Sequence, residues 1–265
     1  MEASTIRTSP QHRLRNAVTD ISMLTKRNLL RYVRIPALLV FSSFQPIMFL
    51  LLFNYVFGGA IGAQSGGSYI NFLLPGIVVQ TVLFGTTATA VGLSEDFSRG
   101  MVDRFRSLPI TRSAVLAGRT LADVARNFLV VILINIVGYM LGFRYSGGLQ
   151  HGLAALVLLL MFGFAFSWIS AVIGMMVKDP ETVQVAGFIW IFPLVFASGV
   201  FVPTQTMPSW LRVFAENQPV TITVNALRSL LLEGTTTDVG KTLLWTGGIL
   251  AVFVPLSVWA YKRIA

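Results

Sequence analysis

A long stretch without any charged side chain, residues 35–94, constrains this chain more than any other feature of its sequence. Two apolar segments inside it, residues 36–57 and 69–93, reach the length of about 20 residues with which an α-helix crosses a bilayer. Only 12% of all residues are charged, whereas soluble domains carry about 25%. A soluble core could not bury this much apolar surface, so the sequence predicts an all-α membrane protein.

Four further apolar stretches have or approach the length of a span: residues 122–143, 152–177, 183–202 and 243–261. We therefore expect six transmembrane helices in one polytopic domain, residues 35–263. Pro180, in the KDPE segment between the fourth and fifth spans, is well placed to stop a helix. In the fourth span, small residues at helical intervals would let a neighbouring helix approach closely; they are Gly163, Ser167, Ala171 and Gly174.

Lysine and arginine are unevenly divided between the two sides that these spans define. If the N-terminus is cytoplasmic, 16 of the 20 lie on the cytoplasmic side, and the other four are Arg144, Arg212, Arg228 and Lys241. Cytoplasmic loops carry such an excess, so we expect both termini in the cytoplasm of a multi-pass protein of the cell membrane. This bias accounts for the net charge of +9 without a nucleic-acid partner. The polar N-terminus lacks the apolar core of a cleavable signal peptide.

Residues 11–34, ahead of the first span, are basic and carry apolar side chains at helical spacing, at Leu14, Val18, Ile21 and Leu24. This pattern predicts an amphipathic helix on the inner leaflet, within a cytoplasmic tail of residues 1–34. The alternative is an ordinary charged flank of the first span.

The dense charged patch LSEDFSRGMVDRFRSLPITR interrupts the apolar sequence at residues 93–112. Read as a helix over residues 95–108, it has an apolar stripe at Phe97, Met101, Phe105 and Leu108. A membrane-surface helix is usually rich in lysine and poor in acids, but this one mixes acids with arginines. Mixed charges beside aromatics suit a groove on another protein. We therefore expect a docking helix at the cytoplasmic face between the second and third spans.

Two long segments resemble a known family of transporters. They are NFLLPGIVVQTVLFGTTATAVGLSEDFSRGMVDRFRSLPITRSAVLAGRTLADVARN, residues 71–127, and FVPTQTMPSWLRVFAENQPVTITVNALRSLL, residues 201–231. Both resemble the permease subunits of type-2 ABC exporters, in particular the daunorubicin-resistance-like drug-export permeases of actinobacteria. The resemblance covers residues 20–263, with long motifs in the right order.

The resemblance implies a division of labour between this chain and its partners. Residues 95–108 would be the coupling helix, which sits in a cleft of a separate ATP-binding subunit. Two such subunits would bind ATP and Mg, and two permeases, identical or related, would form the path for the exported compound. Residues 203–235 would form short helices at the outer surface. The implied interface residues are Glu95, Asp96, Phe97, Arg99, Met101, Asp103, Arg104, Phe105 and Arg106; many relatives carry a small or branched residue in place of Met101.

Polar and aromatic residues embedded in the spans are candidates for the substrate path, at the interface of the two permeases. They are Gln45, Asn54, Gln80, Thr81, Phe84, Asn135, Gln184, Phe188 and Trp190. The alternative is that these polar side chains bond to their own backbone or to a neighbouring helix. The candidates suit an apolar or amphiphilic cargo, such as an antibiotic or a lipid.

No catalytic, cofactor or metal site is expected in the chain itself. Gly234 lies one residue too early for a Walker A loop ending at Lys241 and Thr242. The chain has no cysteine, and its two histidines, His12 and His151, lack nearby ligand residues.

The rival function is a secondary transporter or a passive pore for small solutes. A proton-coupled carrier normally places an ionisable group inside the membrane. Asp123 and Arg126 are expected near the cytoplasmic end of the third span, where they would pair and anchor the helix. The middle of each span would then hold no ionisable group, which disfavours proton coupling but leaves a passive pore open.

Overall fold

The structure is a computed structural model that describes residues 10–34, 37–59, 68–100, 112–177 and 179–264. Within these residues all regular secondary structure is helical. The main helices are α1 (Pro10–Arg34), α2 (Ala37–Leu52), α4 (Tyr69–Ser98), α6 (Arg112–Met140), α7 (Gly148–Met176), α8 (Pro180–Phe196), α9 (Ser209–Asn217), α10 (Pro219–Arg228) and α11 (Val239–Ile264). Short π-helical segments, Phe53–Phe57 and Ser229–Glu233, extend α2 and α10.

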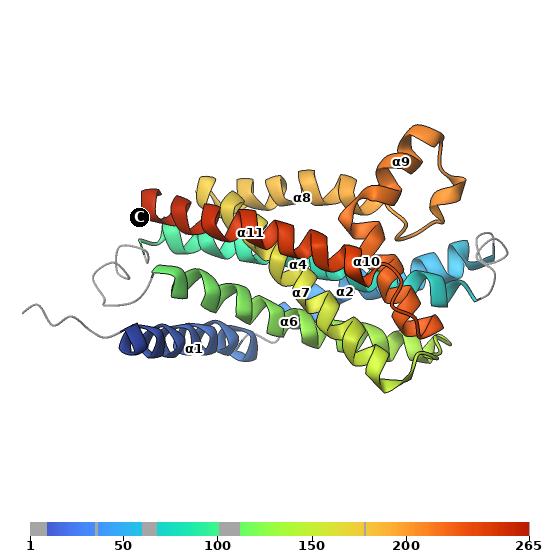
Figure 1. The fold of residues 1–265 in the computed structure, drawn as a ribbon, viewed down its shortest axis with the longest axis horizontal. Coiled ribbons are helices and arrows are strands. Elements are labelled where there is room, and N and C mark those ends of the chain that lie inside the picture. The colour runs from blue at the N-terminus through green and yellow to red at the C-terminus, as the bar shows by residue number, and fades with distance from the viewer. Residues whose placement is uncertain (1–9, 35–36, 60–67, 101–111, 178, 265) are drawn as a thin grey trace, which may run out of the picture.

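The helices form an elongated bundle in which the C-terminus and the start of α6 lie at one end, and α9 and α10 at the other (Figure 1). We call these the proximal and the distal end. Five segments in the described part of the chain are long and apolar enough to cross a membrane: Val40–Phe57, Tyr69–Ser98, Leu116–Met140, Gly148–Met176 and Val239–Tyr261. The predicted all-α membrane architecture is thus confirmed. The orientation of the termini stays a prediction.

Helix α4 is the centre of the bundle, with 20 of its 30 residues buried. Helices α6, α7 and α8 pack around it. Two of the small residues predicted to admit a neighbouring helix face α4: a Cβ atom added to Gly163 would overlap Cγ1 of Val82. A Cβ atom added to Gly174 would lie 2.7 Å from the Cα atom of Ala90. The two backbones can approach this closely only because Gly174 has no side chain.

The amphipathic segment before the first span is a helix, α1, as predicted, and it packs along the proximal half of α6 (Figure 1). Leu24 of α1 and Leu116 of α6 are buried in one apolar cluster. A Cβ atom added to Gly118 would lie only 2.7 Å from the Cβ atom of Leu24. This face of α1 therefore packs against α6 of the same chain. Its position on the inner leaflet stays a prediction.

The fifth predicted span, residues 183–202, is shorter in the structure than expected. Helix α8 has 17 residues and ends at Phe196. Within the described residues it is an apolar helix shorter than the five candidate spans named above. Its end is fixed by tertiary contacts, because the turn after it folds back onto the start of α4. There the Tyr69 hydroxyl donates to the carbonyl oxygen of Phe201 at 2.8 Å. A sixth crossing by α8 stays a prediction.

A half-buried arginine, Arg228, closes the distal end of the bundle. Its guanidinium donates to the carbonyl oxygen of Phe72 at 2.8 Å and to that of Gly199 at 2.9 Å. The same group stacks 3.6 Å above the ring of Phe72. Burial lowers the pKa of Arg228 to about 9. The short helices predicted for residues 203–235 are present, and Arg228 ties them to α4 and to the turn after α8.

Candidate substrate path and coupling segment

A cavity of about 320 Å³ lies between α2, α4, α6 and α8. Six of the nine residues predicted for the substrate path line it, and three different helices supply them. They are Gln45 from α2, Gln80, Thr81 and Phe84 from α4, and Gln184 and Phe188 from α8. Residues far apart in the sequence therefore converge on one cavity, whose size falls in the range of small-molecule sites.

The α4 wall of this cavity alternates polar and aromatic side chains. Gln80, Phe84 and Thr87 are spaced four and three residues apart, so they share one face of the helix. The ring of Phe84 packs against that of Phe188 from α8, with centroids 5.4 Å apart. A Cβ atom added to Gly187 would lie 2.7 Å from Cγ2 of Thr87, so α8 and α4 nearly touch beside the cavity. The wall is amphiphilic along its length.

The cavity also contains a cation that sequence reasoning placed elsewhere. Arg126 was expected near the cytoplasmic end of the third span, as an anchor. It lines the cavity instead, is 6% exposed and donates to the carbonyl oxygen of Gly85 at 2.5 Å, in the middle of α4. It also donates to Oδ1 of Asn127 at 3.1 Å. The contact also lies in the middle of α6, since Arg126 is the fifteenth of its 29 residues.

Asp123 is a second ionisable residue within the packed bundle. Its side chain is 1% exposed and accepts a hydrogen bond of 2.5 Å from the Thr89 hydroxyl of α4. Asp123 is therefore held within the bundle against α4, and its depth in the membrane stays a prediction. The predicted pairing of Asp123 with Arg126 stays a prediction.

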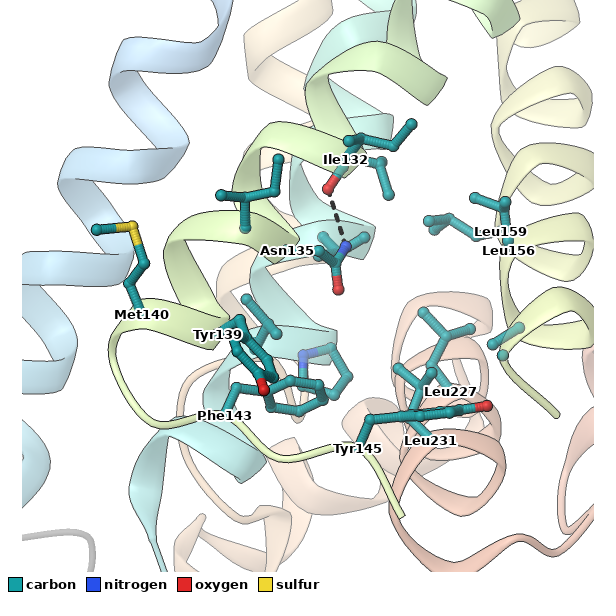
Figure 2. Close-up of a pocket in the computed structure, with 17 residues that line it drawn as sticks. Ile132, Asn135, Tyr139, Met140, Phe143, Tyr145, Leu156, Leu159, Leu227 and Leu231 are labelled. Atoms are coloured by element: carbon teal, nitrogen blue, oxygen red, sulfur yellow. Dashed lines mark hydrogen bonds between the residues drawn. The ribbon is translucent and has the colours of Figure 1, made fainter. Parts of the chain in front are cut away.

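Three residues predicted for the substrate path lie outside this cavity. Asn54 belongs to the π-helical segment Phe53–Phe57. Asn135 lines a second, apolar cavity of about 530 Å³, where it is surrounded by Tyr139, Leu159 and Leu227 (Figure 2). Its amide donates to the carbonyl oxygen of Val131 at 2.8 Å, so it bonds to its own helix.

Trp190, the third of these residues, packs inside the bundle. Its ring stacks on that of Phe166 with centroids 5.9 Å apart and an interplanar angle of 6°. Stacked aromatic rings of this kind stabilise helix packing. Its position therefore gives it a packing role.

The coupling segment begins differently from the prediction. Residues 95–98 are the last turn of α4, which ends at Ser98, and Gly100 has a left-handed φ of 64°. A single helix starting at Glu95 and running through Gly100 is therefore wrong, because the left-handed glycine ends α4. Five of the predicted interface residues lie outside the described residues: Met101, Asp103, Arg104, Phe105 and Arg106.

Two predicted interface residues are engaged within the chain. Oδ2 of Asp96 lies 3.6 Å from Nη1 of Arg119 on α6 and 3.9 Å from Nη2 of Arg27 on α1. The ring of Phe97 packs against that of Tyr261 on α11, with centroids 6.0 Å apart. This proximal clamp, Asp96 with Arg27 and Arg119, holds the end of α4 between α1 and α6. Arg99, in contrast, is exposed.

The GKT motif forms the beginning of a membrane helix. Gly240 and Lys241 lie in the first turn of α11, and Nζ of Lys241 is 2.8 Å from Oδ1 of Asp238. The segment that precedes the motif is the π-helical Ser229–Glu233. A P-loop requires a strand before the glycine-rich turn, so this motif is a helix start.

Comparison with known proteins agrees with these features. A family model described as ABC-2 type transporter matches residues 19–232. The daunorubicin resistance ABC transporter permease protein DrrB1 of Streptomyces coeruleorubidus is 38% identical over 239 residues, which cover 89% of this chain and 84% of the relative.

Two more distant relatives extend the same pattern. The probable doxorubicin resistance ABC transporter permease protein DrrC of Mycobacterium tuberculosis is 27% identical over 96% of this chain and 92% of the relative. The inner membrane transport permease YadH of Escherichia coli is 22% identical over 78% of each chain. The family model matches most of the chain, and the structure is a bundle of helices with five candidate membrane spans. The chain therefore belongs to the ABC-2 type transporter family.

Proposed function

We propose that this chain is the permease subunit of an ATP-driven exporter that moves an apolar or amphiphilic compound out of the cell. The observation that carries the proposal is the amphiphilic cavity between α2, α4, α6 and α8, in which six predicted path residues converge. Two relatives bear names that refer to daunorubicin or doxorubicin resistance. A drug-like or lipid-like amphiphile is therefore the cargo class we propose.

The energy would come from a separate ATP-binding subunit, which binds ATP and Mg and docks on residues 95–108. Helix α4 supports this coupling because it is continuous from the cavity wall to the start of that segment. From Thr87 to Glu95 the helix rises about 12 Å. A displacement of the coupling segment would reach the cavity through this rigid element, while Asp96 keeps α4 connected to α1 and α6.

A second permease, identical or related, would complete the path. Helices α2 and α8 flank the cavity, and both present large exposed aromatic side chains. These are Phe41 and Phe44 on α2, and Phe188 and Phe192 on α8. Aromatic residues are enriched in the buried centres of protein interfaces, which favours this face for contact between permeases over lipid alone.

The test is co-purification with the candidate ATP-binding subunit, followed by measurement of ATP hydrolysis in lipid nanodiscs. Phe105→Glu places a charge in the predicted docking stripe and should abolish complex formation and turnover. Arg104→Glu should weaken both, because it removes a charge-assisted contact with a carboxylate of the partner. Phe214→Glu, in exposed α9 at the distal end, is the matched control and should leave both unchanged.

A carrier driven by protons is the second candidate, because Asp123 and Arg126 are buried in the bundle. It predicts that the chain alone, in liposomes, moves solute in response to a pH gradient. Failure of every candidate ATP-binding subunit to associate, together with such movement, would replace the exporter proposal. Movement that requires the partner and ATP would exclude the carrier.

A further inference from the structure

We infer that the apolar cavity between α4, α6, α7 and α10 binds one phospholipid, whose acyl chain lies in the cavity and whose phosphate binds Arg144. We call this cavity the lateral groove; its volume is about 530 Å³. Among the described residues, none lines both the lateral groove and the proposed substrate cavity. The inference therefore concerns a resident lipid and not the cargo, and it does not depend on the proposed function.

The lateral groove opens on the outside of the bundle. Its floor consists of buried side chains, among them Leu74 of α4, Leu159 of α7 and Leu227 of α10. Its rim includes Ile136 and Met140 of α6, which are both exposed. Because α4, α6 and α7 are candidate membrane spans, the surroundings of this opening are lipid rather than water.

The wall of the groove favours hydrocarbon over water. Among its described residues, polar side chains come only from Asn135, Tyr139 and Tyr145. The amide of Asn135 donates to the carbonyl oxygen of Val131, and the hydroxyl of Tyr145 donates to that of Gly148. Apolar cavities stay dry and take up apolar molecules. An acyl chain from the surrounding bilayer is therefore the occupant that this wall fits.

The groove is elongated and has an aromatic mouth. Ile132 and Tyr139 on its α6 wall are seven residues apart, which corresponds to about 10 Å along the helix. Figure 2 shows Ile132 toward one end of the cavity, and Tyr139, Phe143 and Tyr145 at the other. Tyrosine is enriched where a span meets the headgroup region. A lipid chain that enters the groove would thus have its headgroup beside these tyrosines.

Arg144 provides a cation at the level of the headgroups. It lies in the connection between two candidate spans, Leu116–Met140 and Gly148–Met176, and it is exposed. Lipid phosphates lie just outside the hydrocarbon core that such spans cross. The charge of Arg144 is therefore complementary to the group that a phospholipid presents at this depth.

The guanidinium of Arg144 is held at the mouth of the groove. Its Cζ atom lies 4.5 Å from the centroid of the Tyr139 ring, which lines the groove. Nη1 donates to the carbonyl oxygens of Tyr139 and Phe143, at 2.9 Å each. Both of these bonds come from Nη1, so the donors of Nε and Nη2 remain for a ligand. Arginine binds phosphate oxygens through two such parallel donors.

The test compares two lipids with the same acyl chains: dioleoylphosphatidic acid, and dioleoylglycerol, which lacks the phosphate. Each is titrated into the full-length chain in detergent, and native mass spectrometry counts the bound molecules. We expect one molecule of the phosphatidic acid to bind about tenfold more tightly than dioleoylglycerol, because of its charged hydrogen bonds. Equal affinity would overturn the role of the phosphate. Inorganic phosphate is the third probe; if it binds as tightly as phosphatidic acid, the site takes a free anion and the inference is wrong.

Variants of Arg144 assign this preference to its charge. Arg144→Gln should bind both lipids equally, whereas Arg144→Lys keeps a cation and should still prefer phosphatidic acid. Arg212→Gln is the matched control, because it removes an exposed cation from α9 at the same end of the bundle, and it should keep the full preference. If Arg144→Lys loses the preference as completely as Arg144→Gln, Arg144 only caps α6 and does not bind the phosphate.

A second pair of variants tests the position of the acyl chain. Ile132→Trp places an indole ring in the groove and should abolish binding of both lipids. Leu133→Trp is the control, because Leu133 is an exposed neighbour that does not line the groove, and it should bind both normally. Normal binding by Ile132→Trp would place the chain elsewhere. A lipid-free dimer that Ile132→Trp dissociates would show that a second copy covers the groove, and would overturn the inference.

Discussion

The guanidinium of Arg126 donates a hydrogen bond to the backbone carbonyl of Gly85, 41 residues earlier in the chain. The contact joins α6 to the middle of α4, at the wall of the proposed substrate cavity. It depends on the missing side chain of Gly85, because a Cβ atom there would lie 2.9 Å from Nη2 of Arg126. A cation is thereby held inside a bundle of mostly apolar helices.

Gly85→Ala should displace Arg126 and disturb the cavity. The loss of a hydrogen bond from a charged donor costs about 1.5–3 kcal/mol, so we expect a lower melting temperature in detergent. Gly247→Ala, on α11, is the control, since a Cβ atom there meets nothing within 4 Å. Equal melting temperatures for the two variants would show that the contact contributes nothing to stability.

Arg228→Ala should open the distal end of the bundle. The substitution leaves the carbonyl oxygens of Phe72 and Gly199 without their donor, at a cost of about 1–3 kcal/mol for each buried group left unpaired. Amide hydrogen exchange should accelerate in residues 197–203. Arg144→Ala is the matched control, because Arg144 also lies over an aromatic ring, 4.5 Å from the centroid of Tyr139, but is exposed. Unchanged exchange in Arg228→Ala would refute this role.

Asp96→Asn should separate coupling from docking. The carboxylate of Asp96 lies near Arg27 and Arg119 of the same chain, so its neutralisation should leave binding of the ATP-binding subunit intact. It should reduce the stimulation of ATP hydrolysis by substrate, since α4 is then held less firmly between α1 and α6. Pull-down and turnover measured on one preparation would check both. Loss of binding would instead place Asp96 in the docking surface.

Asp179→Ala should destabilise the start of α8, and Asp179→Asn should not. Oδ2 of Asp179 accepts hydrogen bonds from the Thr182 hydroxyl at 2.5 Å and from the Thr182 backbone amide at 2.8 Å. Asparagine can also form the cap to the backbone amide. These bonds hold the pKa of Asp179 below its ordinary value. The charged cap therefore stabilises α8 above the ordinary carboxyl pKa and is lost as pH falls through the lower folded value. Thermal melts from neutral to acidic pH should show this dependence in the unmodified chain and not in Asp179→Asn.

The fold was largely predictable from hydropathy, whereas the ends of the helices were not. Hydropathy locates only the apolar part of a helix, so it gave a span from residue 122 and did not show that Arg126 lies at the middle of α6. The end of α8 depends on contacts with Arg228 and Tyr69, which lie far away in the sequence. The local periodicity of the sequence does not predict helix ends that depend on such tertiary contacts.

The cavity was predictable in part, because polar residues inside apolar spans stand out. Gln80 and Gln184 were found in this way. Thr87 was not singled out, since a threonine that bonds to its own helix and one that does not look the same in a sequence. Only the structure separates Thr81, with its bond to Ile77, from Thr87.

The most direct test of the central claim is ATP hydrolysis by the complex of this chain with its ATP-binding subunit, measured with and without an aromatic amphiphile as the probe cargo. We predict that the probe stimulates turnover, that Phe105→Glu abolishes turnover, and that Phe214→Glu changes nothing. If neither the probe nor Phe105→Glu changes the rate of ATP hydrolysis, an exporter coupled through residues 95–108 is contradicted.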